Sequence, residues 1–385
     1  MSVLQELQER ALIHQFTGLS LDEILSENRT VYLGMDPTAP AIHIGYLIPI
    51  TLCTILRKHG CKIIVLLGGA TAMIGDPTGK SSQRKTLTQE EITSNLSSLK
   101  SNISKFFPNS QIVNNYDWLG HIELMEFLNL YARHVSVNAL VKLESFHKRL
   151  SSEQPLSMLE IFYPILQGYD FYYLHKHYNC TLQLGGSDQW ANILYGVDLV
   201  KRLSNTTVYG LTCPLLLNQA GEKMGKTGSG TIWLDEKLCP VFDFWQYWRN
   251  ISDDDTLRFA KIFFNLTPSS EQTHDFNSFK KLFATQITAL VHGQEKALTA
   301  QQEAENMFEQ KDFSNISTHL IPNTHRLCDI LVSLSWTKTL SQAKELIKSG
   351  SITINHEKIL DPTIVPAHDT ILCKGKKTYC RIIHK

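Results

Sequence analysis

The sequence predicts an α/β fold in which a doubly wound parallel sheet is followed by an all-α domain and then by a small α+β module. Between residues 30 and 217, short apolar segments alternate with longer helical patterns, as expected for parallel strands and their crossover helices. After Trp233 the strand signal disappears, and only helical patterns follow up to about residue 310. Beyond that point, two short helical patterns precede further strand-like segments.

The first domain is defined by apolar segments that predict strands at residues 31–34, 62–67, 111–114, 181–184 and 211–217. Helical patterns lie between them, at about residues 43–59, 89–107, 122–148, 157–178 and 188–203. This order is typical of a Rossmann-like domain, which we place at residues 1–218. Ligands of such sheets bind at the carboxyl ends of the strands, so the residues that follow each strand are the candidates for function.

The rest of the chain divides into four parts. Residues 219–235 form a loop rich in glycine and lysine, and residues 236–318 carry the helical patterns, near 240–250, 254–264, 277–291 and 293–310. Residues 319–325 are polar, contain a proline and lack periodicity, so they predict a linker. Residues 326–385 predict helices at 326–335 and 341–349 and strands at 352–355, 370–373 and 378–383.

Composition excludes several classes of protein. With 43% hydrophobic and 19% charged residues, the chain is neither disordered nor fibrous. The longest mainly apolar run, residues 47–56, is far too short for a membrane helix. The eight cysteines lack the close spacing of zinc ligands and lie scattered in apolar stretches. This pattern predicts reduced thiols, no zinc and a cytoplasmic protein.

Charge is unevenly distributed along a chain whose formal net charge is zero. Residues 326–385 contain 10 Lys and Arg against 5 Asp and Glu, whereas the whole chain contains 37 of each kind. A basic tail on an acidic body indicates contact with a polyanion such as nucleic acid. A solvated lysine-rich surface is the alternative interpretation.

A glycine-containing segment follows the first predicted strand. Its polar and glycine positions are Tyr32, Gly34, Asp36 and Thr38, and then His43, Gly45 and Tyr46 at the start of a helix. Glycines between a strand and a helix let backbone N–H groups approach a phosphate, which the helix dipole also favours. Alone, the pattern is equally compatible with a surface histidine near a helix start.

The second predicted strand leads into another glycine-rich loop, at residues 68–81. It looks like a phosphate-binding P-loop but fails the spacing, because Ile74 stands where that motif needs glycine. What remains is a loop with one carboxylate, Asp76, and two cations, Lys80 and Arg84. An ordinary turn rich in glycine and proline is the alternative.

Tyr163, Gln167 and Asp170 share one face of a predicted helix whose other positions are mainly apolar. A solvated face would prefer lysine and glutamate, whereas these three side chains form a hydrogen-bonding set that suits a polar ligand. We therefore expect this helix face to line a binding site.

The fourth predicted strand ends in a glycine pair followed by Asp188 and Gln189. The pair, which includes Gly186, lets a nucleoside lie against the backbone, and Asp188 can accept hydrogen bonds from ribose hydroxyls. A helix N-cap is the alternative role for Asp188. Further along, Lys223, Lys226 and Thr227 lie in a loop with four glycines, which predicts mobile point charges for phosphates.

Taken in order, these motifs resemble those of the class I aminoacyl-tRNA synthetases. His43-Ile-Gly45-Tyr46 and Lys223-Met-Gly-Lys226-Thr227 look like the two signatures of that class, and the segments between them are similar to the bacterial-type tyrosyl-tRNA synthetases. The resemblance runs from about Gln5 to the C-terminus. It implies a catalytic domain at residues 1–218, a helical anticodon-binding domain at 236–318 and an RNA-binding module at 326–385.

The resemblance also implies roles for individual residues. Tyrosine would be bound by Tyr32, Asp76, Tyr163, Gln167, Asp170 and Gln189, with Tyr32 and Asp170 at its phenol. Phosphate chemistry would belong to Thr38, His43, Lys80, Arg84, Lys223, Lys226 and Thr227. The adenylate would contact Gly34, Asp36, Gly45, Tyr46, Gly186 and Asp188. Tyr46 departs from the family, which usually has a histidine at this position.

The activity implied by the resemblance is the ATP-dependent attachment of L-tyrosine to tRNA(Tyr) by a homodimer without membrane association. ATP is then a substrate accompanied by Mg²⁺, and no metal site is expected in the protein. Two alternatives stay open: the tryptophan enzyme, which shares the fold and both signatures, and a catalytically silent relative that binds RNA. The pair of Tyr32 and Asp170 argues against the first, and the intact lysine loop argues against the second.

Overall fold

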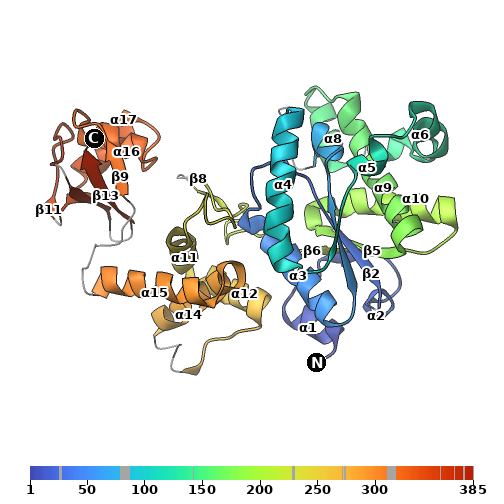
Figure 1. The fold of residues 1–385 in the computed structure, drawn as a ribbon, viewed down its shortest axis with the longest axis horizontal. Helices are drawn as coiled ribbons and strands as arrows, with labels where there is room; N and C mark the ends of the chain where they lie inside the picture. The colour runs from blue at the N-terminus through green and yellow to red at the C-terminus, as the bar shows by residue number, and fades with distance from the viewer. Residues whose placement is uncertain are drawn as a thin grey trace. The chain divides into compact units, whose positions relative to one another are not determined.

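The structure is a computed structural model, and it describes residues 1–385 except 26–27, 79–86, 142, 228–229, 271, 273–274, 310–317, 356, 368, 376–377 and 385. The chain, whose helices and strands are labelled in Figure 1, forms two compact units. The first comprises residues 1–224, 233–238 and 251–280, and the second comprises residues 225–232, 239–250 and 281–385. The region expected as one helical domain, 236–318, therefore contributes to both units.

A six-stranded sheet with the order β1-β6-β5-β2-β3-β4 forms the centre of the first unit. Its strands are β1 (Gln15–Phe16), β2 (Thr30–Met35), β3 (Lys62–Leu67), β4 (Gln111–Asn114), β5 (Cys180–Gly186) and β6 (Tyr209–Cys213). All neighbours are parallel except β1, which pairs antiparallel to β6. After β2, the chain adds β3 and then β4 on one side of it, and β5 is then added on the other side of β2. The strand order thus reverses between β2 and β5, where ligands of such sheets bind.

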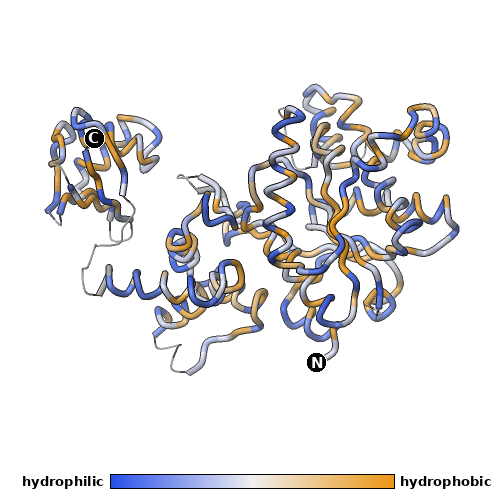
Figure 2. The backbone as a smooth tube through the Cα atoms, in the orientation of Figure 1, coloured by the Kyte–Doolittle hydropathy of each residue, from blue (hydrophilic) through white to orange (hydrophobic). Residues whose placement is uncertain are grey.

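Helices cover both faces of this sheet. The crossovers β2-α3-β3 and β5-α10-β6 run in opposite directions, and right-handed connections then place α3 and α10 on opposite faces. Figure 2 shows apolar residues concentrated along the central strands. The helices of this unit are α1 (Val3–Glu9), α2 (Leu21–Ile24), α3 (Leu47–Lys58), α4 (Gln89–Phe106), α5 (Tyr116–Leu119), α6 (Leu124–Leu130), α7 (Val137–Leu140), α8 (Glu144–Ser151), α9 (Met158–Tyr178), α10 (Trp190–Ser204) and α12 (Asp253–Phe264), with single turns η1 (Ile44–Tyr46), η2 (Thr71–Met73), η3 (Ala132–His134) and η4 (Ser187–Gln189).

Local sequence signals explain the ends of helix α9. Ser157 accepts a hydrogen bond from the Glu160 backbone N–H and Glu160 reciprocates, which forms a capping box. The helix ends at Asn179, whose φ of 53° is left-handed. The expected helix at 157–178 is confirmed. The single helix expected at 122–148 is wrong, because α6, η3, α7 and α8 occupy this stretch and many of its apolar residues are exposed instead of sharing one buried face.

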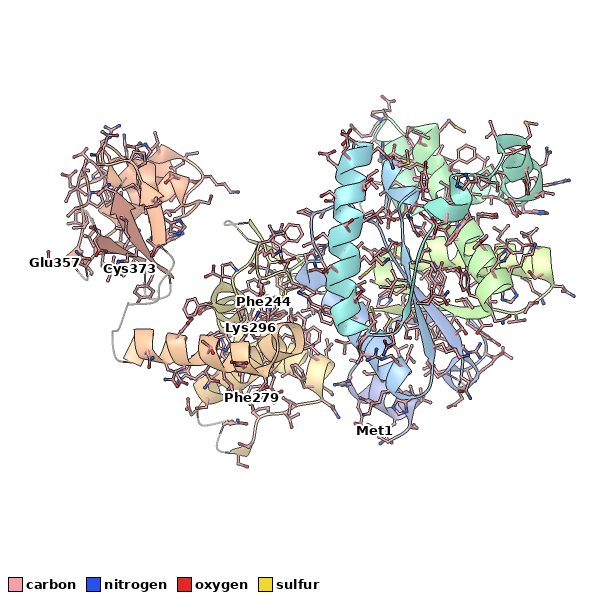
Figure 3. The ribbon with its side chains drawn as sticks, in the orientation of Figure 1. Met1, Phe244, Phe279, Lys296, Glu357 and Cys373 are labelled. Carbon is pink, nitrogen blue, oxygen red and sulfur yellow. The ribbon has the colours of Figure 1, made fainter. Side chains whose placement is uncertain are left out.

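The second unit begins with the hairpin of β7 (Lys226–Thr227) and β8 (Gly230–Thr231). Helices α11 (Val241–Arg249) and α15 (Gln294–Glu309) pack together, and α14 (Phe276–His292) runs from the first unit into the second. Phe244 of α11, labelled in Figure 3, is fully buried. Its ring lies 4.9 Å from that of His292. None of the described helices is long and apolar enough to cross a lipid bilayer.

A five-stranded sheet with the order β11-β10-β12-β13-β9 forms the C-terminal module. Its elements are β9 (Thr318–Ile321), α16 (Leu327–Ser333), α17 (Leu340–Lys348), β10 (Ile352–Ile354), β11 (Glu357–Lys358), β12 (Thr370–Lys374) and β13 (Thr378–His384). The linker expected at 319–325 is wrong in its first part, because β9 pairs parallel to β13. Only Ile321 of β9 is buried, so this strand gives no periodic apolar signal.

Candidate active site

The glycine-rich loops meet at the carboxyl ends of β2, β3 and β5. Gly34 is the exposed position near the end of β2, between buried neighbours, and a Cβ there would meet nothing closer than Tyr32 Cε2 at 3.9 Å. Gly68, just after β3, is the opposite case, because a Cβ there would lie 1.9 Å from Asp36 Oδ1. The first glycine therefore leaves space for a ligand, and the second lets the backbone approach a carboxylate.

Tyr32 and Asp170 form the innermost part of the site. Tyr32 on β2 is 1% exposed, and its hydroxyl has no hydrogen-bond partner among the described residues. Asp170 on α9 is 2% exposed and accepts hydrogen bonds from Asn115 Nδ2 at 3.0 Å and Trp118 Nε1 at 2.8 Å. The pair thus combines an unpartnered buried hydroxyl with a buried carboxylate that is held by two donors.

Burial changes the acidity of both groups. Desolvation raises the pKa of Asp170 to about 7, the Asn115 and Trp118 donors lower it, and the charge of Asp36 raises it further. Burial also raises the pKa of Tyr32 well above its ordinary value, with the nearby Asp170 adding to the effect. At neutral pH, Tyr32 is therefore a neutral donor, while Asp170 lies close to the midpoint of its own titration.

A chain of side-chain hydrogen bonds connects Asp170 to Asp36. Asn115 Nδ2, which is shared with Asp170, lies 3.0 Å from Thr71 Oγ1, and the Thr71 hydroxyl donates to Asp36 Oδ1 at 2.8 Å. The Tyr163 hydroxyl donates to the other oxygen of Asp36 at 2.7 Å. Both carboxylate oxygens of Asp36 therefore accept hydrogen bonds from side chains of the protein, and one of these bonds orients Tyr163.

A second network of amide side chains surrounds Asp76. Gln189 Nε2 donates to Asp76 Oδ2 at 2.7 Å, and the Thr78 backbone N–H donates to Asp76 Oδ1 at 2.9 Å. Gln167 Nε2 lies 3.3 Å from Gln189 Oε1, and Asn192 Nδ2 donates to Gln167 Oε1 at 3.1 Å. Asp76, Gln167 and Gln189, which are far apart in the sequence, are thus brought together as predicted.

His43 lies at the start of η1, after the loop that follows β2. Its Nδ1 accepts a hydrogen bond from the Gly45 N–H at 3.0 Å, and its ring lies 5.2 Å from that of Tyr46. A Cβ at Gly45 would lie 2.6 Å from His43 Cε1, so this contact needs glycine. Thr38 closes the turn before it by donating its backbone N–H to the Asp36 carbonyl at 2.8 Å.

Asp188 and Lys223 form an ion pair, with 3.0 Å between Asp188 Oδ2 and Lys223 Nζ. Asp188 follows Gly186, the last residue of β5, where a Cβ would lie 2.9 Å from Asp188 Oδ1. The backbone of Lys226 and Thr227 forms β7, in the second unit. Two predicted residues, Lys80 and Arg84, lie outside the described residues.

Sequence reasoning missed Asn115, Trp118, Thr71 and Asn192, which orient the predicted residues. Asn115 is fully buried and directly follows the end of β4, and its Oδ1 also accepts from the Ala70 N–H at 2.8 Å. A polar residue just after a strand, at the same edge as the other loops, was the signal that could have revealed it. Trp118 and Asn192 carry no comparable local signal. Among the described residues, no three His, Cys, Asp or Glu side chains gather as a metal site would require.

Comparison with known proteins agrees with this fold. Residues 26–309 match the family described as tRNA synthetases class I (W and Y), and residues 305–382 match the tyrosine–tRNA ligase SYY-like C-terminal domain. The chain therefore belongs to the class I tRNA synthetases of the tryptophan and tyrosine group.

Within that group the chain falls among the tyrosyl members. A tyrosine–tRNA ligase of Orientia tsutsugamushi (strain Ikeda) is 41% identical over 100% of this chain and 99% of its own length. One of Clostridium perfringens (strain 13 / Type A) is 39% identical over 99% of both chains. A C-terminally truncated mitochondrial tyrosyl-tRNA synthetase of Aspergillus nidulans, 26% identical, superposes with a TM-score of 0.70 over 80% of this chain and 94% of its own. The expected resemblance to bacterial-type tyrosyl-tRNA synthetases is confirmed.

Proposed function

We propose that this chain activates L-tyrosine with ATP, giving tyrosyl-adenylate and pyrophosphate, and then transfers tyrosine to the 3′-terminal adenosine of tRNA(Tyr). The buried pair of Tyr32 and Asp170 carries this proposal. The phenol of a bound tyrosine, placed between them, donates a hydrogen bond to the Asp170 carboxylate and accepts a hydrogen bond from the unpartnered Tyr32 hydroxyl.

The same pair explains the choice of amino acid. Phenylalanine leaves the buried Tyr32 hydroxyl unpaired, at a cost of about 1–3 kcal/mol, and offers no donor to the Asp170 carboxylate. The indole of tryptophan donates but does not accept, so Tyr32 stays unpaired. The tryptophan alternative is therefore not favoured, in agreement with the tyrosyl relatives.

Asp76, Tyr163 and Gln167 would bind the α-ammonium group, and Gln189 would lie near the carboxylate. This assignment is supported by the amide network, which leaves Asp76 as the carboxylate at its centre. A buried ammonium needs such a charged partner. Asp36 would contribute indirectly, because it accepts a hydrogen bond from the Tyr163 hydroxyl and so orients it.

In the first step, a carboxylate oxygen of tyrosine attacks the α-phosphorus of ATP, and the bond from that phosphorus to the leaving pyrophosphate breaks. This reaction requires alignment and stabilisation of the departing charge, with no protein nucleophile. Those roles fall to Thr38, His43, Lys80, Arg84, Lys223, Lys226 and Thr227. The adenylate would lie along Gly34, Gly45, Tyr46, Gly186 and Asp188. Mg²⁺ enters bound to ATP as part of the substrate.

The C-terminal module and the helical region would hold the tRNA. The match to a tyrosine–tRNA ligase C-terminal domain and the excess of Lys and Arg at residues 326–385 support this role for the module. The helices between residues 236 and 318 would bind the anticodon. We place the charging reaction in the cytoplasm.

The enzyme would act as a homodimer through its first unit. Leu124, Met125, Val137, Met158 and Leu159 are each more than half exposed, and all lie between α6 and the start of α9. Large apolar side chains gathered in one stretch of a folded chain are typical of an interaction surface. A second copy of this chain would cover them.

ATP–pyrophosphate exchange with tyrosine, tryptophan and phenylalanine tests the activation step, and charging of tRNA(Tyr) tests the transfer. We expect exchange with tyrosine to exceed both others and charging to follow. Exchange that prefers tryptophan would refute the substrate, and RNA binding without any exchange would support the silent relative instead.

A further inference from the structure

Tyr173 lies one turn after Asp170 on helix α9 and stacks on Trp118, one of the two side chains that donate to Asp170. The centres of the Tyr173 and Trp118 rings are 4.2 Å apart, and their planes differ by 15°. Trp118 Nε1 donates to Asp170 Oδ1 at 2.8 Å. Residues three apart on a helix share a face, so α9 carries both the carboxylate and the ring that supports its donor.

The indole of Trp118 needs this support because it is carried by a very short helix. Helix α5 has four residues, and its N-cap residue, Asn115, makes no side-chain capping hydrogen bond. In a close-packed interior, a stacked ring restricts the tilt of the indole plane. The Nε1–H bond lies in that plane, and a hydrogen bond weakens steeply as its angle departs from linear. The Tyr173 ring therefore sets the direction in which Trp118 donates.

A second ring packs on Tyr173 itself. The His177 ring, one further turn along α9, lies 4.2 Å from that of Tyr173, with 31° between the two planes. Two rings this close to a third lie on its opposite faces, because on one face they would collide. Tyr173 is thus held between Trp118, which is 6% exposed, and the exposed His177. The three rings form a column that runs from the surface to the donor of Asp170.

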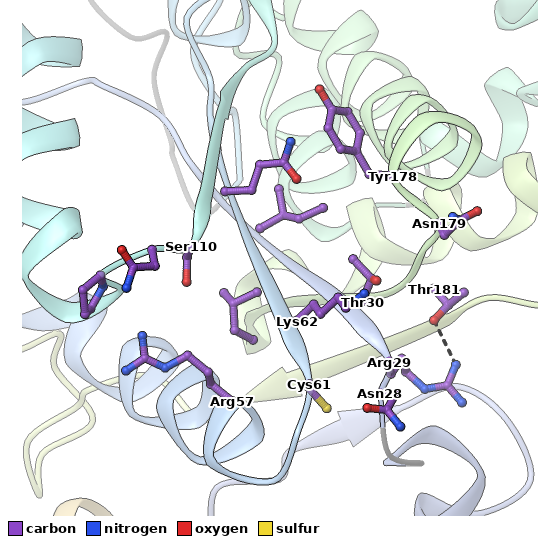
Figure 4. A pocket seen from close by; sticks show the side chains of 15 residues that line it. Asn28, Arg29, Thr30, Arg57, Cys61, Lys62, Ser110, Tyr178, Asn179 and Thr181 are labelled. Atoms are coloured by element: carbon purple, nitrogen blue, oxygen red, sulfur yellow. Dashed lines mark hydrogen bonds between the residues drawn. The ribbon is translucent and has the colours of Figure 1, made fainter.

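The end of α9 is anchored to the sheet just beyond this column. His175 Nδ1 lies 3.0 Å from the carbonyl of Cys180, the first residue of β5. Figure 4 shows Asn179 at the end of the helix and the hydrogen bond that Arg29 Nη1 donates to Thr181 Oγ1 of β5 at 3.1 Å. Side chains on rigid elements keep their geometry more closely than side chains on loops. The ring that supports Trp118 therefore belongs to a fixed part of the fold.

We propose that Tyr173 is a positioning residue for tyrosine recognition, because its ring holds the Trp118 indole in the plane in which Nε1 donates to Asp170. Without the ring, the donor is still present but misdirected. The ionised form of Asp170 then loses part of the stabilisation that Trp118 provides. This inference rests on the proposed tyrosine activation, in which Asp170 accepts the hydrogen bond of the phenol.

Tyr173→Leu tests the proposal, since leucine keeps an apolar side chain that favours a helix but offers no flat surface. The first measurement is kcat/KM for tyrosine in ATP–pyrophosphate exchange from pH 6 to 10. We expect the acid limb to move up by about half a pH unit and kcat/KM at pH 7 to fall about twofold. The kcat/KM for phenylalanine should show no such shift. Asp36, Tyr32 and Tyr163, which also interact electrostatically with Asp170, stay unchanged in this variant.

Matched variants isolate the contribution of the ring. Tyr173→Phe keeps the stacking surface and loses only the hydroxyl, so it should retain the wild-type acid limb. Tyr172→Leu removes the neighbouring tyrosine, whose ring lies 5.8 Å from that of Tyr131 and 6.3 Å from that of Tyr169, and it should also retain the limb. In the background of Trp118→Phe there is no donor to direct, so Tyr173→Leu should cause no additional shift there.

A second measurement does not require enzyme activity. The chain has six tryptophans, so the indole N–H signal of Trp118 in the NMR spectrum of tryptophan-labelled protein can be assigned by its loss in Trp118→Phe. A buried, hydrogen-bonded N–H exchanges slowly with solvent. We expect the Trp118 indole N–H to exchange at least about tenfold faster in Tyr173→Leu than in Tyr173→Phe or the wild type.

The outcomes separate this proposal from the proposed function. In an enzyme that activates tyrosine, an unmoved acid limb or unchanged N–H exchange in Tyr173→Leu would overturn the positioning role. An equal shift in Tyr173→Phe or Tyr172→Leu would also overturn it. A shift that persists in the Trp118→Phe background would arise from another group, such as His177, and has the same consequence. If the wild type does not activate tyrosine but the N–H exchange follows the expectation, the proposed function is refuted and the support of Trp118 by Tyr173 is retained.

Discussion

Replacing Asn115 by alanine is expected to shift the pH dependence of tyrosine recognition. Asn115 donates one of the two hydrogen bonds that favour the ionised form of Asp170. Burial raises the pKa of Asp170, and the Asn115 hydrogen bond partly offsets this rise by stabilising the ionised carboxylate. Without this donor the pKa of Asp170 therefore rises above its value of about 7. At neutral pH a larger fraction of Asp170 is then protonated and accepts the phenol proton less well.

The size of the effect follows from the energy of the lost bond. A hydrogen bond to a charged group contributes about 1.5–3 kcal/mol, and 1.36 kcal/mol corresponds to one pH unit. The pKa of Asp170 should therefore increase by about one to two. Near pH 7.5, where the wild-type group is mostly ionised, the variant should lose roughly tenfold in kcat/KM for tyrosine.

The assay is ATP–pyrophosphate exchange from pH 6 to 10 with tyrosine and phenylalanine as substrates. The kcat/KM for tyrosine reports ionisation of the free enzyme, so its acid limb should lie near pH 7 in the wild type and higher in Asn115→Ala. Phenylalanine has no phenol, so its kcat/KM should lack this limb. Trp118→Phe is the matched variant, because it removes the other donor to Asp170 without touching Thr71 or the Ala70 N–H.

Two results would refute this reasoning. If neither variant moves the acid limb for tyrosine, Asp170 does not control the profile. If the limb moves equally for phenylalanine, the titrating group is not at the phenol.

Three further predictions concern other parts of the chain. Tyr32→Phe removes a buried hydroxyl without a partner, so the unliganded protein should become more stable by about 1 kcal/mol while discrimination against phenylalanine falls; a lower melting temperature with unchanged discrimination would contradict the assignment. Lys226→Ala should slow single-turnover adenylate formation far more than it weakens tyrosine binding, because this lysine would act on the pyrophosphate as its charge develops. Equal losses in both measurements would place it in the amino-acid pocket. Deletion of residues 310–385 should leave tyrosine activation intact, reduce tRNA charging and flatten its salt dependence; full charging with the same salt slope would make the basic tail a solvated surface.

The strands of the first unit were predictable where both faces are buried. The segment at 62–67 coincides with β3, where every residue after Lys62 is buried. The segment at 111–114 also coincides with β4, although this edge strand has one exposed and three half-buried residues. The segment at 211–217 was placed too late, since β6 covers Tyr209–Cys213 and Leu216 is buried in the loop that follows. Buried residues outside strands are also apolar, so an apolar run can extend beyond the end of a strand. The strand β1, with two residues, is too short to give a recognisable pattern.

The site was predictable at the level of loops and helix faces. Tyr163, Gln167 and Asp170 could be grouped because helical spacing is local. The link from Asp170 through Asn115 and Thr71 to Asp36 could not, because it joins four separate segments whose contacts arise only in the folded sheet. The raised pKa of Asp170 has the same origin, since its main cause is burial among residues distant in the sequence.

The pairing of β9 with β13 decides how the C-terminal module behaves in isolation. A fragment that starts at Arg326 begins after β9 and leaves the whole length of β13 as an uncovered sheet edge. That edge carries Tyr379, Cys380, Ile382 and Ile383, and an open strand of this kind invites pairing with other molecules and aggregation. A fragment that starts ahead of Thr318 keeps β9 in place, which covers the edge from Arg381 to His384. We therefore expect a fragment that contains β9 to stay monomeric and a fragment that lacks β9 to self-associate.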